Sequence, residues 1–484
     1  MKKRVLFIAS ECVPFIKTGG LADVVGSLPK YYDQEKYDVR VIIPNYRCIS
    51  PEWKEKMNFV TSFYMDMAWR SQYVGIMELK CDGIQYYFID NEYYLAGDRP
   101  YGNIHEDIEK FAYFSKAALS ILPVVDFQPD IVHCHDWQTG LVPVYLKDSF
   151  HEGEFYANMK SIMTIHNLKF QGAWNIPTVQ DATGLDMSYF TSDKLEAFGD
   201  ANYLKGGIVY ADLVTTVSRT YAEEIKTTFY GEHLDGLMRA RSNVLTGIVN
   251  GLDYNEWNPA TDTMIAKNYS VQNFRKEKVK NKLALQKELG LEEDKKKMLI
   301  GIVSRLTDQK GFDLIAYVMD ELCQDEVQIV VLGTGEERYE NMFRHFAWKY
   351  NGKVAACIYY SNELSHKIYA ACDAFLMPSL FEPCGLSQLM SLRYGTLPIV
   401  RETGGLKDTV EPYNEFEETG TGFSFANYNA HEMLNTVRYA ESIYYDKKRS
   451  WNKMVERAMN ADFSWNNSAK QYEALYEKLT ECNG

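Results

Sequence analysis

The sequence lacks the features of a secreted or membrane-spanning protein. Its nine cysteines are odd in number, never spaced Cys-x-x-Cys, and scattered over positions 12, 48, 81, 134, 323, 357, 372, 384 and 482. This pattern excludes a disulfide framework and a zinc ribbon, and it favours a reducing cytoplasm. No apolar run approaches the ~18 residues of a transmembrane helix. The start, MKKRVLFIAS, imitates a signal peptide, but Glu11 ends an apolar run that is too short for one, so a first β-strand is predicted.

Basic residues are too few for a nucleic-acid partner. The chain has 52 Lys and Arg against 66 Asp and Glu, a net charge of −14, which repels phosphates over most of the surface. A neutral polymer is not excluded. The composition, 46% hydrophobic and without low-complexity tracts, is that of a folded protein. Because 484 residues exceed what one hydrophobic core usually supports, two domains with a deep cleft between them are expected.

Short apolar segments alternate with longer helical patterns. One series comprises residues 5–10, 39–44, 130–136, 161–167 and 212–218, and a second comprises 298–304, 327–333, 354–360, 374–379 and 397–402. This alternation is typical of βαβ units, so the sequence predicts two Rossmann-like, doubly wound parallel sheets in tandem. The domain connection is expected near residues 251–259. Residues 464–479 predict a helix capped by Ser464, and their pattern leaves open which domain it packs on.

Ligands of such sheets bind beyond the carboxyl ends of the strands, so the residues after each strand are the candidates. After the first strand, KTGGLAD (17–23) places Lys17, Gly19 and Gly20 at the beginning of a helix. Close backbone approach, a helix N-terminus and a lysine favour an anion such as a diphosphate. A strand-to-helix turn with a solvated lysine is the alternative.

The motif HCHDWQTG (133–140) ends the third segment. Side-chain alternation along a strand puts His133 and His135 on one face, which raises the possibility of a metal. Further ligands at a supporting spacing are lacking, so no metal site is predicted. Asp136 and Trp137, at the end of the strand, are better placed to bind a polar ligand and to stack on a sugar.

The motif TIHN (164–167) ends the fourth segment and brings His166 and Asn167 to the same sheet edge. A lone histidine is often a structural residue. Its position at the end of a strand makes a functional role about as probable as a structural one. Both interpretations are kept.

The second series carries two further motifs. The first motif, SRLTDQKG (304–311), places Arg305 and Lys310 just before a helix. Both cations can bind a diphosphate there. The glycines of GTG (333–335), after the second strand, predict another turn where the backbone can come close to a ligand. In PSLFEPCGLS (378–387), Glu382 precedes a glycine-led helix start, where a carboxylate can accept sugar hydroxyls and free N–H groups can bind a phosphate. Ordinary surface charges and a helix-start acid are the alternatives.

These motifs, with YGTLPIVRETGGLKDTV (394–410), occur in order from Val5 to about Phe463. Together they resemble the bacterial glycogen synthases and plant starch synthases. The resemblance implies the GT-B fold, in which the C-terminal helix (464–484) crosses back to a first domain of residues 1–250, and a second domain of residues 251–463 binds the nucleotide sugar. It also implies transfer of glucose from ADP-glucose to the non-reducing 4-OH of an α-1,4-glucan such as glycogen or starch, with retention of configuration and without a cofactor.

The resemblance also implies roles for individual residues. Arg305 and Lys310 hold the diphosphate, Glu382 with His166 orients the glucose, and Asp136 faces the acceptor. The other implied substrate-binding positions are Lys17, Gly19, Gly20, Asn167, Asn250, Tyr360 against the base, Cys384, Gly385, Leu386 and Ser387. Two positions depart from the family pattern, because Met390 stands where the wider superfamily has a second glutamate and Ser387 where many relatives have threonine.

The mechanism predicted from these residues needs no metal. Arg305, Lys310 and a helix N-terminus can stabilise the leaving diphosphate electrostatically. Because no residue is an evident nucleophile, front-face attack assisted by the leaving phosphate is favoured over a covalent intermediate. Three alternatives remain: a GT-B enzyme with UDP-glucose or another acceptor, a non-catalytic glucan-binding module, and a glucan phosphorylase, which needs a pyridoxal cofactor and a longer chain.

Overall fold

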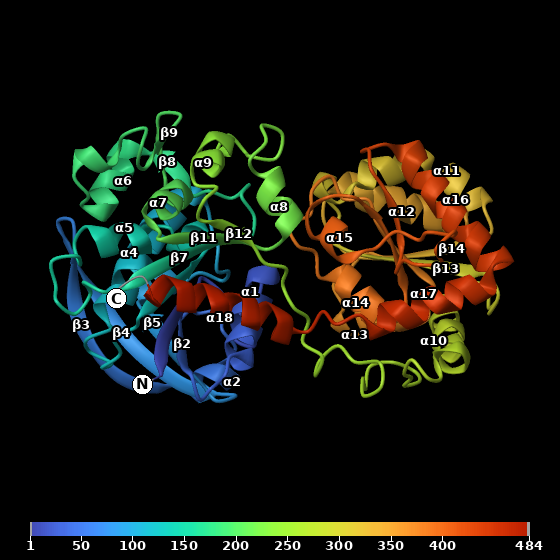
Figure 1. The fold of residues 1–484 in the computed structure, drawn as a ribbon, viewed down its shortest axis with the longest axis horizontal. Helices are drawn as coiled ribbons and strands as arrows, with labels where there is room; N and C mark the ends of the chain where they lie inside the picture. The colour runs from blue at the N-terminus through green and yellow to red at the C-terminus, as the bar shows by residue number, and fades with distance from the viewer. Residues whose placement is uncertain (1, 482–484) are drawn as a thin grey trace. The chain divides into compact units, whose positions relative to one another are not determined.

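The computed structural model describes residues 2–481, and the chain folds around two large β-sheets in two compact units. Unit 1 comprises Met1–Gly251 with Trp465–Gly484, and unit 2 comprises Leu252–Ser464. Both units are drawn in Figure 1. Within the described residues, no helix is long and apolar enough to cross a membrane.

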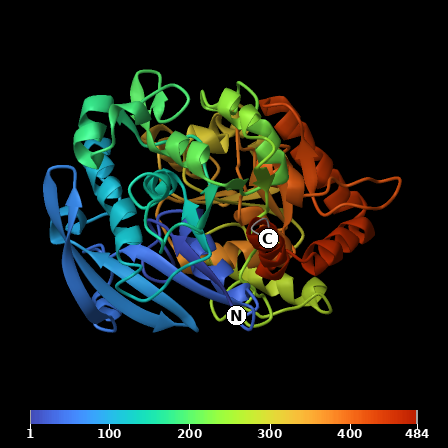
Figure 2. The same ribbon diagram turned by 60° about the vertical axis from the view of Figure 1, so that its left-hand side comes forward.

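The main sheet of unit 1 has nine strands in the order β12-β11-β7-β6-β1-β2-β5-β4-β3. Their bounds are β1 Lys3–Ile8, β2 Tyr37–Pro44, β3 Asn58–Met67, β4 Arg70–Cys81, β5 Ile84–Asp90, β6 Ile131–His135, β7 Lys160–Ile165, β11 Leu213–Thr216 and β12 Leu245–Gly247. The five predicted segments correspond to β1, β2, β6, β7 and β11, which pair in parallel. The antiparallel hairpin β3–β4, the long blue strands in Figure 2, extends the sheet at one edge and is not predicted from the sequence.

Helices cover both faces of this sheet. They are α1 Gly20–Ser27, α2 Pro51–Lys54, α3 Glu92–Leu95, α4 Ile104–Ser120, α5 Leu141–Lys147, α6 Ile176–Thr183, α7 Tyr203–Tyr210, α8 Arg219–Glu224, α9 Asp235–Ala240 and α18 Trp465–Glu481. A small antiparallel sheet joins β8 Ala173–Asn175, β10 Asp200–Asn202 and β9 Glu196–Ala197. Residues of β1 alternate between the faces: Val5 and Phe7 pack with α1 and α18, whereas Leu6 and Ile8 pack with α4, α5 and α7. This two-sided burial is typical of a doubly wound sheet.

The C-terminal helix α18 packs on unit 1 (Figure 1). Its rings Trp465, Tyr472 and Tyr476 are each at most 1% exposed. Since a buried aromatic ring removes about 150–250 Å² from water, these three hold the helix on the face that α1 also covers. The pattern of the helix predicts its existence and leaves open which domain it packs on, and the crossing back to the first domain is an expectation from the resemblance alone.

Unit 2 contains a six-stranded parallel sheet in the order β15-β14-β13-β16-β17-β18. The strands are β13 Met298–Val303, β14 Val327–Leu332, β15 Val354–Cys357, β16 Ala374–Met377, β17 Leu397–Arg401 and β18 Phe423–Phe425, and the first five are the predicted ones. The helices are α10 Phe274–Glu288, α11 Phe312–Gln324, α12 Glu337–Lys349, α13 Asn362–Ala371, α14 Ser387–Arg393, α15 Gly404–Thr409, α16 Ala430–Asp446 and α17 Lys448–Asn460. Met298, Ile300 and Ile302 of β13 pack with α11 and α16, and Leu299 packs with α10 and α13 on the other face.

Candidate functional site

The loop that carries Lys17 is held by a carboxylate that sequence reasoning passed over. Glu11, only 3% exposed, follows β1 and accepts hydrogen bonds from the N–H and hydroxyl of Thr18, the N–H of Gly19 and the hydroxyl of Tyr101. Burial raises the pKa of Glu11, and these hydrogen bonds act in the opposite direction. The loop is thus fixed from inside the protein, directly before α1 begins at Gly20.

Lys17 itself lies at the surface of this loop. Its ammonium forms an ion pair with Asp23 at 2.7 Å, and its side chain is 47% exposed. An exposed pair of this kind contributes little to stability. Lys17 can therefore exchange Asp23 for an anionic ligand at small cost.

Asp136 determines the position of the His166 loop. Its φ of 57° lies in the left-handed region, which a non-glycine residue adopts only where surrounding contacts hold it. Its Oδ1 accepts a hydrogen bond from the backbone N–H of His166 at 2.7 Å, and the backbone N–H of Asn167 also bonds the carboxylate. Burial raises the pKa of Asp136 to about 7. The structure thus brings three predicted residues together, at the ends of β6 and β7, and the acceptor-facing role of Asp136 stays a prediction.

His133 and His135 lie on one face of β6, as the alternation predicts, with ring centroids 4.4 Å apart. His133 bonds the Tyr476 hydroxyl through Nδ1 (2.9 Å) and the Thr164 hydroxyl through Nε2 (2.6 Å). His135 bonds His166, from Nδ1 to Nε2, at 3.0 Å. Burial lowers the pKa of His133 and of His166 to about 3 and holds that of His135 well below its ordinary value, so all three rings are neutral near pH 7.

Within the described part of the chain, these hydrogen bonds leave Nε2 of His135 as the one ring nitrogen of the His133–His135 pair without a partner. Over residues 2–481, no three His, Cys, Asp or Glu side chains are grouped so that they could hold a metal ion.

Trp137 is a core residue, so the prediction of a sugar-stacking platform at this position is wrong. The ring is 7% exposed and packs against Phe111 and Tyr203. Gly172 lies so close that a Cβ there would be 2.1 Å from a ring carbon of Trp137. The strand-end position correctly placed Asp136, but the short 3₁₀ turn Trp137–Thr139 directs the indole inward.

Asn250 lies at the end of unit 1. The residue is 5% exposed, and its side-chain Oδ1 is buried without a hydrogen-bond partner among the described residues. Because a buried amide oxygen without a partner is costly, this atom is suited to accept a hydrogen bond from a ligand or a water.

In unit 2 the predicted residues Lys310 and Glu382 form a largely buried ion pair. Both carboxylate oxygens of Glu382 accept from the Lys310 ammonium, at 2.9 and 2.7 Å, and Ser379 donates its hydroxyl to Oε2 at 3.0 Å. The side chains are 17% and 7% exposed. Lys310 ends the 3₁₀ turn Asp308–Lys310 after β13, and Glu382 follows β16, so adjacent strands bring together residues 72 positions apart.

Arg305 is exposed, and its guanidinium makes no ion pair or hydrogen bond with another described residue. The nearby turn requires glycine at position 311, where φ is 75° and a Cβ would lie 2.1 Å from the carbonyl oxygen of Pro378. The loop of Arg305 and Lys310 therefore packs directly on the loop that carries Glu382. An exposed guanidinium without a described partner and an ammonium with one of its three donors left thus lie on one short segment.

Gln388 holds the loop of residues 384–387. Its side-chain amide donates hydrogen bonds to the carbonyls of Cys384 (3.0 Å) and Gly385 (2.9 Å). Gly404, with φ 45°, lies so close that a Cβ would be 1.9 Å from the carbonyl oxygen of Glu382. Ser387 begins α14, and Leu386 is its N-cap. Tyr360 is 85% exposed, and its role against the base stays a prediction.

Several supporting residues were not predicted: Glu11, Ser379, Gln388 and Arg401, whose guanidinium donates to the Leu380 carbonyl at 2.7 Å. Glu11, Ser379 and Arg401 lie just after or at the end of a strand, so the strand-end rule could have found them. Gln388 carries no such signal, because its role depends on the fold of the loop that it supports.

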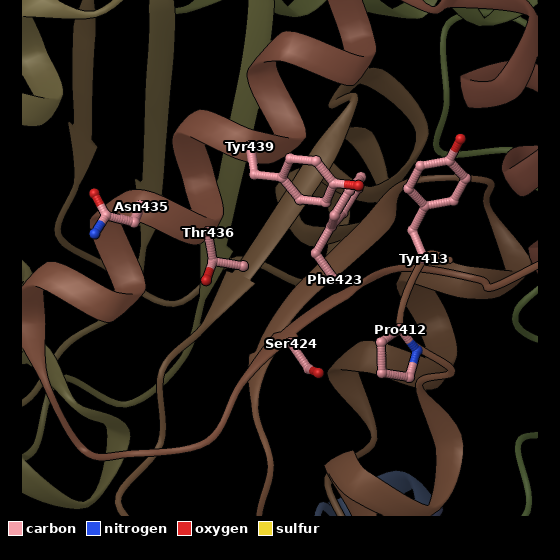
Figure 3. Close-up of a pocket in the computed structure, with 7 residues that line it drawn as sticks. All are labelled: Pro412, Tyr413, Phe423, Ser424, Asn435, Thr436 and Tyr439. Carbon is pink, nitrogen blue, oxygen red and sulfur yellow. The ribbon is translucent and has the colours of Figure 1, made fainter. Parts of the chain in front are cut away.

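Unit 2 also has a surface pocket of about 210 Å³ between α16, β18 and the preceding loop (Figure 3). It shares no residue with the predicted site. Its lining consists of Pro412, Tyr413, Phe423, Ser424, Asn435, Thr436 and Tyr439.

Comparison with known proteins gives consistent results over the whole chain. Residues 4–240 match the family model described as starch synthase catalytic domain, and residues 285–458 match glycosyl transferases group 1. The chain is 73% identical to the glycogen synthase of Lachnospira eligens, covering 99% of this chain and 100% of that protein. It is 51% identical to the glycogen synthase of Geobacillus stearothermophilus, covering 98% of each.

Among solved structures, the catalytic domain of starch synthase IV from Arabidopsis thaliana, bound to ADP and acarbose, matches with a TM-score of 0.92 at 32% identity over 99% of this chain and 100% of that one. Sucrose-phosphate synthase from Thermosynechococcus elongatus matches with a TM-score of 0.63 at 18% identity over 99% and 100%, which shows the fold alone. The predicted GT-B fold with two parallel sheets is thereby confirmed.

Proposed function

The chain belongs to the family of bacterial glycogen synthases and starch synthases and is a glucosyltransferase, and we propose that it takes glucose from ADP-glucose and adds it to the non-reducing 4-OH of an α-1,4-glucan with retention of configuration. The observation that carries this proposal is the Lys310–Glu382 pair with the open Arg305 beside it. The ADP bound to the Arabidopsis relative supports adenine as the base.

Lys310 and Arg305 stabilise the leaving diphosphate. An ammonium has three N–H donors, and the two oxygens of Glu382 take two of them, so Lys310 retains one for a phosphate oxygen. Arg305 adds a planar fork of donors that needs no prior partner to be displaced. Charge develops on the diphosphate as the glycosidic bond breaks, and a cation fixed in a partly buried site, as Lys310 is, acts most strongly on that state.

Glu382 and His166 orient the glucosyl group, by hydrogen bonds to its hydroxyls. Glu382 is fixed by Lys310 and Ser379, and His166 by Asp136 and His135. In the front-face reaction, the bond from C1 to the phosphate oxygen breaks while C1 bonds the acceptor O4 on the same face. The O4 proton passes to the departing phosphate, so no protein nucleophile is needed.

We also propose that the reaction needs no metal and takes place in the cytoplasm. Arg305 and Lys310 supply the positive charge that a metal supplies in other transferases. The eight described cysteines are free thiols, which a reducing compartment preserves.

The test uses purified full-length protein, glycogen, and either ADP-[¹⁴C]glucose or UDP-[¹⁴C]glucose, with label counted in precipitated polymer. We expect incorporation from ADP-glucose to exceed that from UDP-glucose and to persist in excess EDTA. Preferential use of UDP-glucose would favour the alternative of another GT-B donor. Absence of incorporation from both would contradict the proposal.

A further inference from the structure

His135 and His166 share one hydrogen bond at the edge of the unit 1 sheet. His135 ends β6, opposite Thr164 of β7 in the parallel register, and His166 follows β7. Nδ1 of His135 lies 3.0 Å from Nε2 of His166, and the ring centroids are 5.3 Å apart. Burial lowers the pKa of both rings, so each carries a single ring proton near pH 7. One of the two facing nitrogens must donate and the other must accept.

The surroundings of His135 decide between the two arrangements. Its other nitrogen, Nε2, is buried and has no hydrogen-bond partner among the described residues. If His166 donated through Nε2–H, the proton of His135 would be on its own Nε2, and a buried N–H would have no acceptor. Nε2 of His135 lacks a partner in either arrangement, but buried N–H groups without an acceptor are rarer in folded proteins than buried acceptors without a donor, so a bare ring nitrogen is the less costly state. The favoured arrangement therefore has His135 donating from Nδ1–H to Nε2 of His166.

His135 is held firmly enough to impose this choice. The ring is fully buried between Phe7, 5.2 Å away at 26°, and His133, 4.4 Å away at 22°. His133 is anchored in turn by the Tyr476 hydroxyl of α18 and by the Thr164 hydroxyl. Four elements, β1, β6, β7 and α18, thus fix the orientation of His135.

The consequence lies on the far side of the His166 ring. With Nε2 accepting, the ring proton of His166 is on Nδ1. This nitrogen bonds no described residue and is not buried, so a ligand can reach it. The backbone of His166 is fixed separately by the hydrogen bond to Asp136. Both the position and the donor character of the imidazole are therefore set before any ligand arrives.

We propose that His135 is a positioning residue that fixes the tautomer of His166, so that Nδ1–H of His166 is a permanent hydrogen-bond donor to a hydroxyl oxygen of the bound sugar. The sugar as ligand rests on the proposed function, whereas the tautomer itself does not. The same motif that raised the possibility of a metal thus has another use: His135 acts through His166.

The tautomer can be measured without an activity assay. Full-length protein labelled with [¹⁵N]histidine gives long-range ¹H–¹⁵N correlation patterns that distinguish Nδ1–H from Nε2–H, and His166→Gln assigns the His166 signals. We expect wild-type His166 to show a protonated Nδ1 and an accepting Nε2. A protonated Nε2 on His166 in the wild-type protein overturns the proposal, whatever the activity.

Variants then test whether His135 is responsible. His135→Leu removes the donor and should move His166 toward the Nε2–H form, with kcat reduced about 10-fold to 100-fold, the size of effect seen when outer partners of metal-bound histidines are removed. His135→Asn places a side-chain amide where Nδ1 lies in the wild-type protein. It should restore part of the Nδ1–H form of His166 and part of kcat. The matched control is His133→Gln, on the same strand and equally buried: its amide can still bond the Tyr476 and Thr164 hydroxyls, and it leaves the His135–His166 hydrogen bond in place, so the melting temperature should fall but the tautomer of His166 should not change.

Each outcome bears on the proposal. If His135→Leu does not fold, the wild-type spectrum and His135→Asn still decide the question. If the His135→Leu variant folds, keeps the wild-type kcat and shows the wild-type tautomer of His166, His135 is only a core residue and the proposal is wrong. If the tautomer changes while wild-type protein transfers no glucose, the proposed function fails and the positioning role stands.

Discussion

Replacing Lys310 by alanine should affect stability and catalysis by amounts that can be separated. In the wild-type protein the ammonium lies 2.7 Å from Glu382, and the two side chains are 17% and 7% exposed. Removing one partner of a buried ion pair costs about 3–5 kcal/mol because the other charge stays buried without compensation. For a domain of this size, about 2–4 °C of melting temperature is lost per kcal/mol, so the unfolding midpoint of unit 2 should fall by roughly 6–20 °C.

Catalysis should suffer independently. One preorganised donor to the charge that develops in the transition state is worth about 10²–10³ in kcat. The double variant Lys310→Ala/Glu382→Gln separates the two effects, because it removes both charges. Most of the lost stability should return, while kcat stays low.

The measurements are initial rates of label transfer to glycogen and thermal unfolding of the same preparations by circular dichroism. Glu382→Gln alone is the matched control and should have little activity, and its melting temperature should fall by less than that of Lys310→Ala, because the Lys310 ammonium loses its counter-charge but keeps the amide oxygen as an acceptor. A Lys310→Ala protein with near-normal kcat would refute the leaving-group role. An unchanged melting temperature would refute the buried-pair argument, as would a double variant that stays as unstable as Lys310→Ala, and a double variant that regains activity would contradict the leaving-group role.

Three further outcomes are expected. Arg305→Ala should reduce kcat by about 10²–10³ without a change in melting temperature, since the exposed guanidinium bonds no other described residue; a loss of stability instead would mean a structural role. Lys17→Ala should lower kcat but leave the melting temperature within about 1 °C, because its pair with Asp23 is exposed, and wild-type kinetics would show that the loop is only a turn. Burial lowers the pKa of folded His166 to about 3, below the ordinary ~6.5 of the unfolded chain. The stability that the neutral His166 ring contributes is therefore present above pH 6.5 and lost as the pH falls toward 3. His166→Gln should lose less stability than the wild-type protein between pH 6.5 and pH 4, and equal losses of melting temperature in the two proteins would contradict this.

The sequence alone determined the elements and the places where chemistry could occur. Apolar segments that are buried on both faces, such as 298–304 and 327–333, appear as short continuous hydrophobic runs, and the helices between them force a parallel sheet. The carboxyl ends of parallel strands share one edge, so Asp136 and His166 could be expected near each other, as could Arg305, Lys310 and Glu382. These are local patterns repeated along the chain, which is why the chain order suffices to find them.

Only the tertiary structure decided what each of these side chains contacts. No local signal shows that Trp137 turns into the core, that Glu11 holds the Lys17 loop, or that α18 packs Tyr476 against His133. The Lys310–Glu382 pair joins positions 72 residues apart, and the His135–His166 hydrogen bond joins positions 31 apart across two strands. Such contacts depend on strand order and on the free energy of burying a polar group with a partner, and both are properties of the packed fold and not of any segment within it.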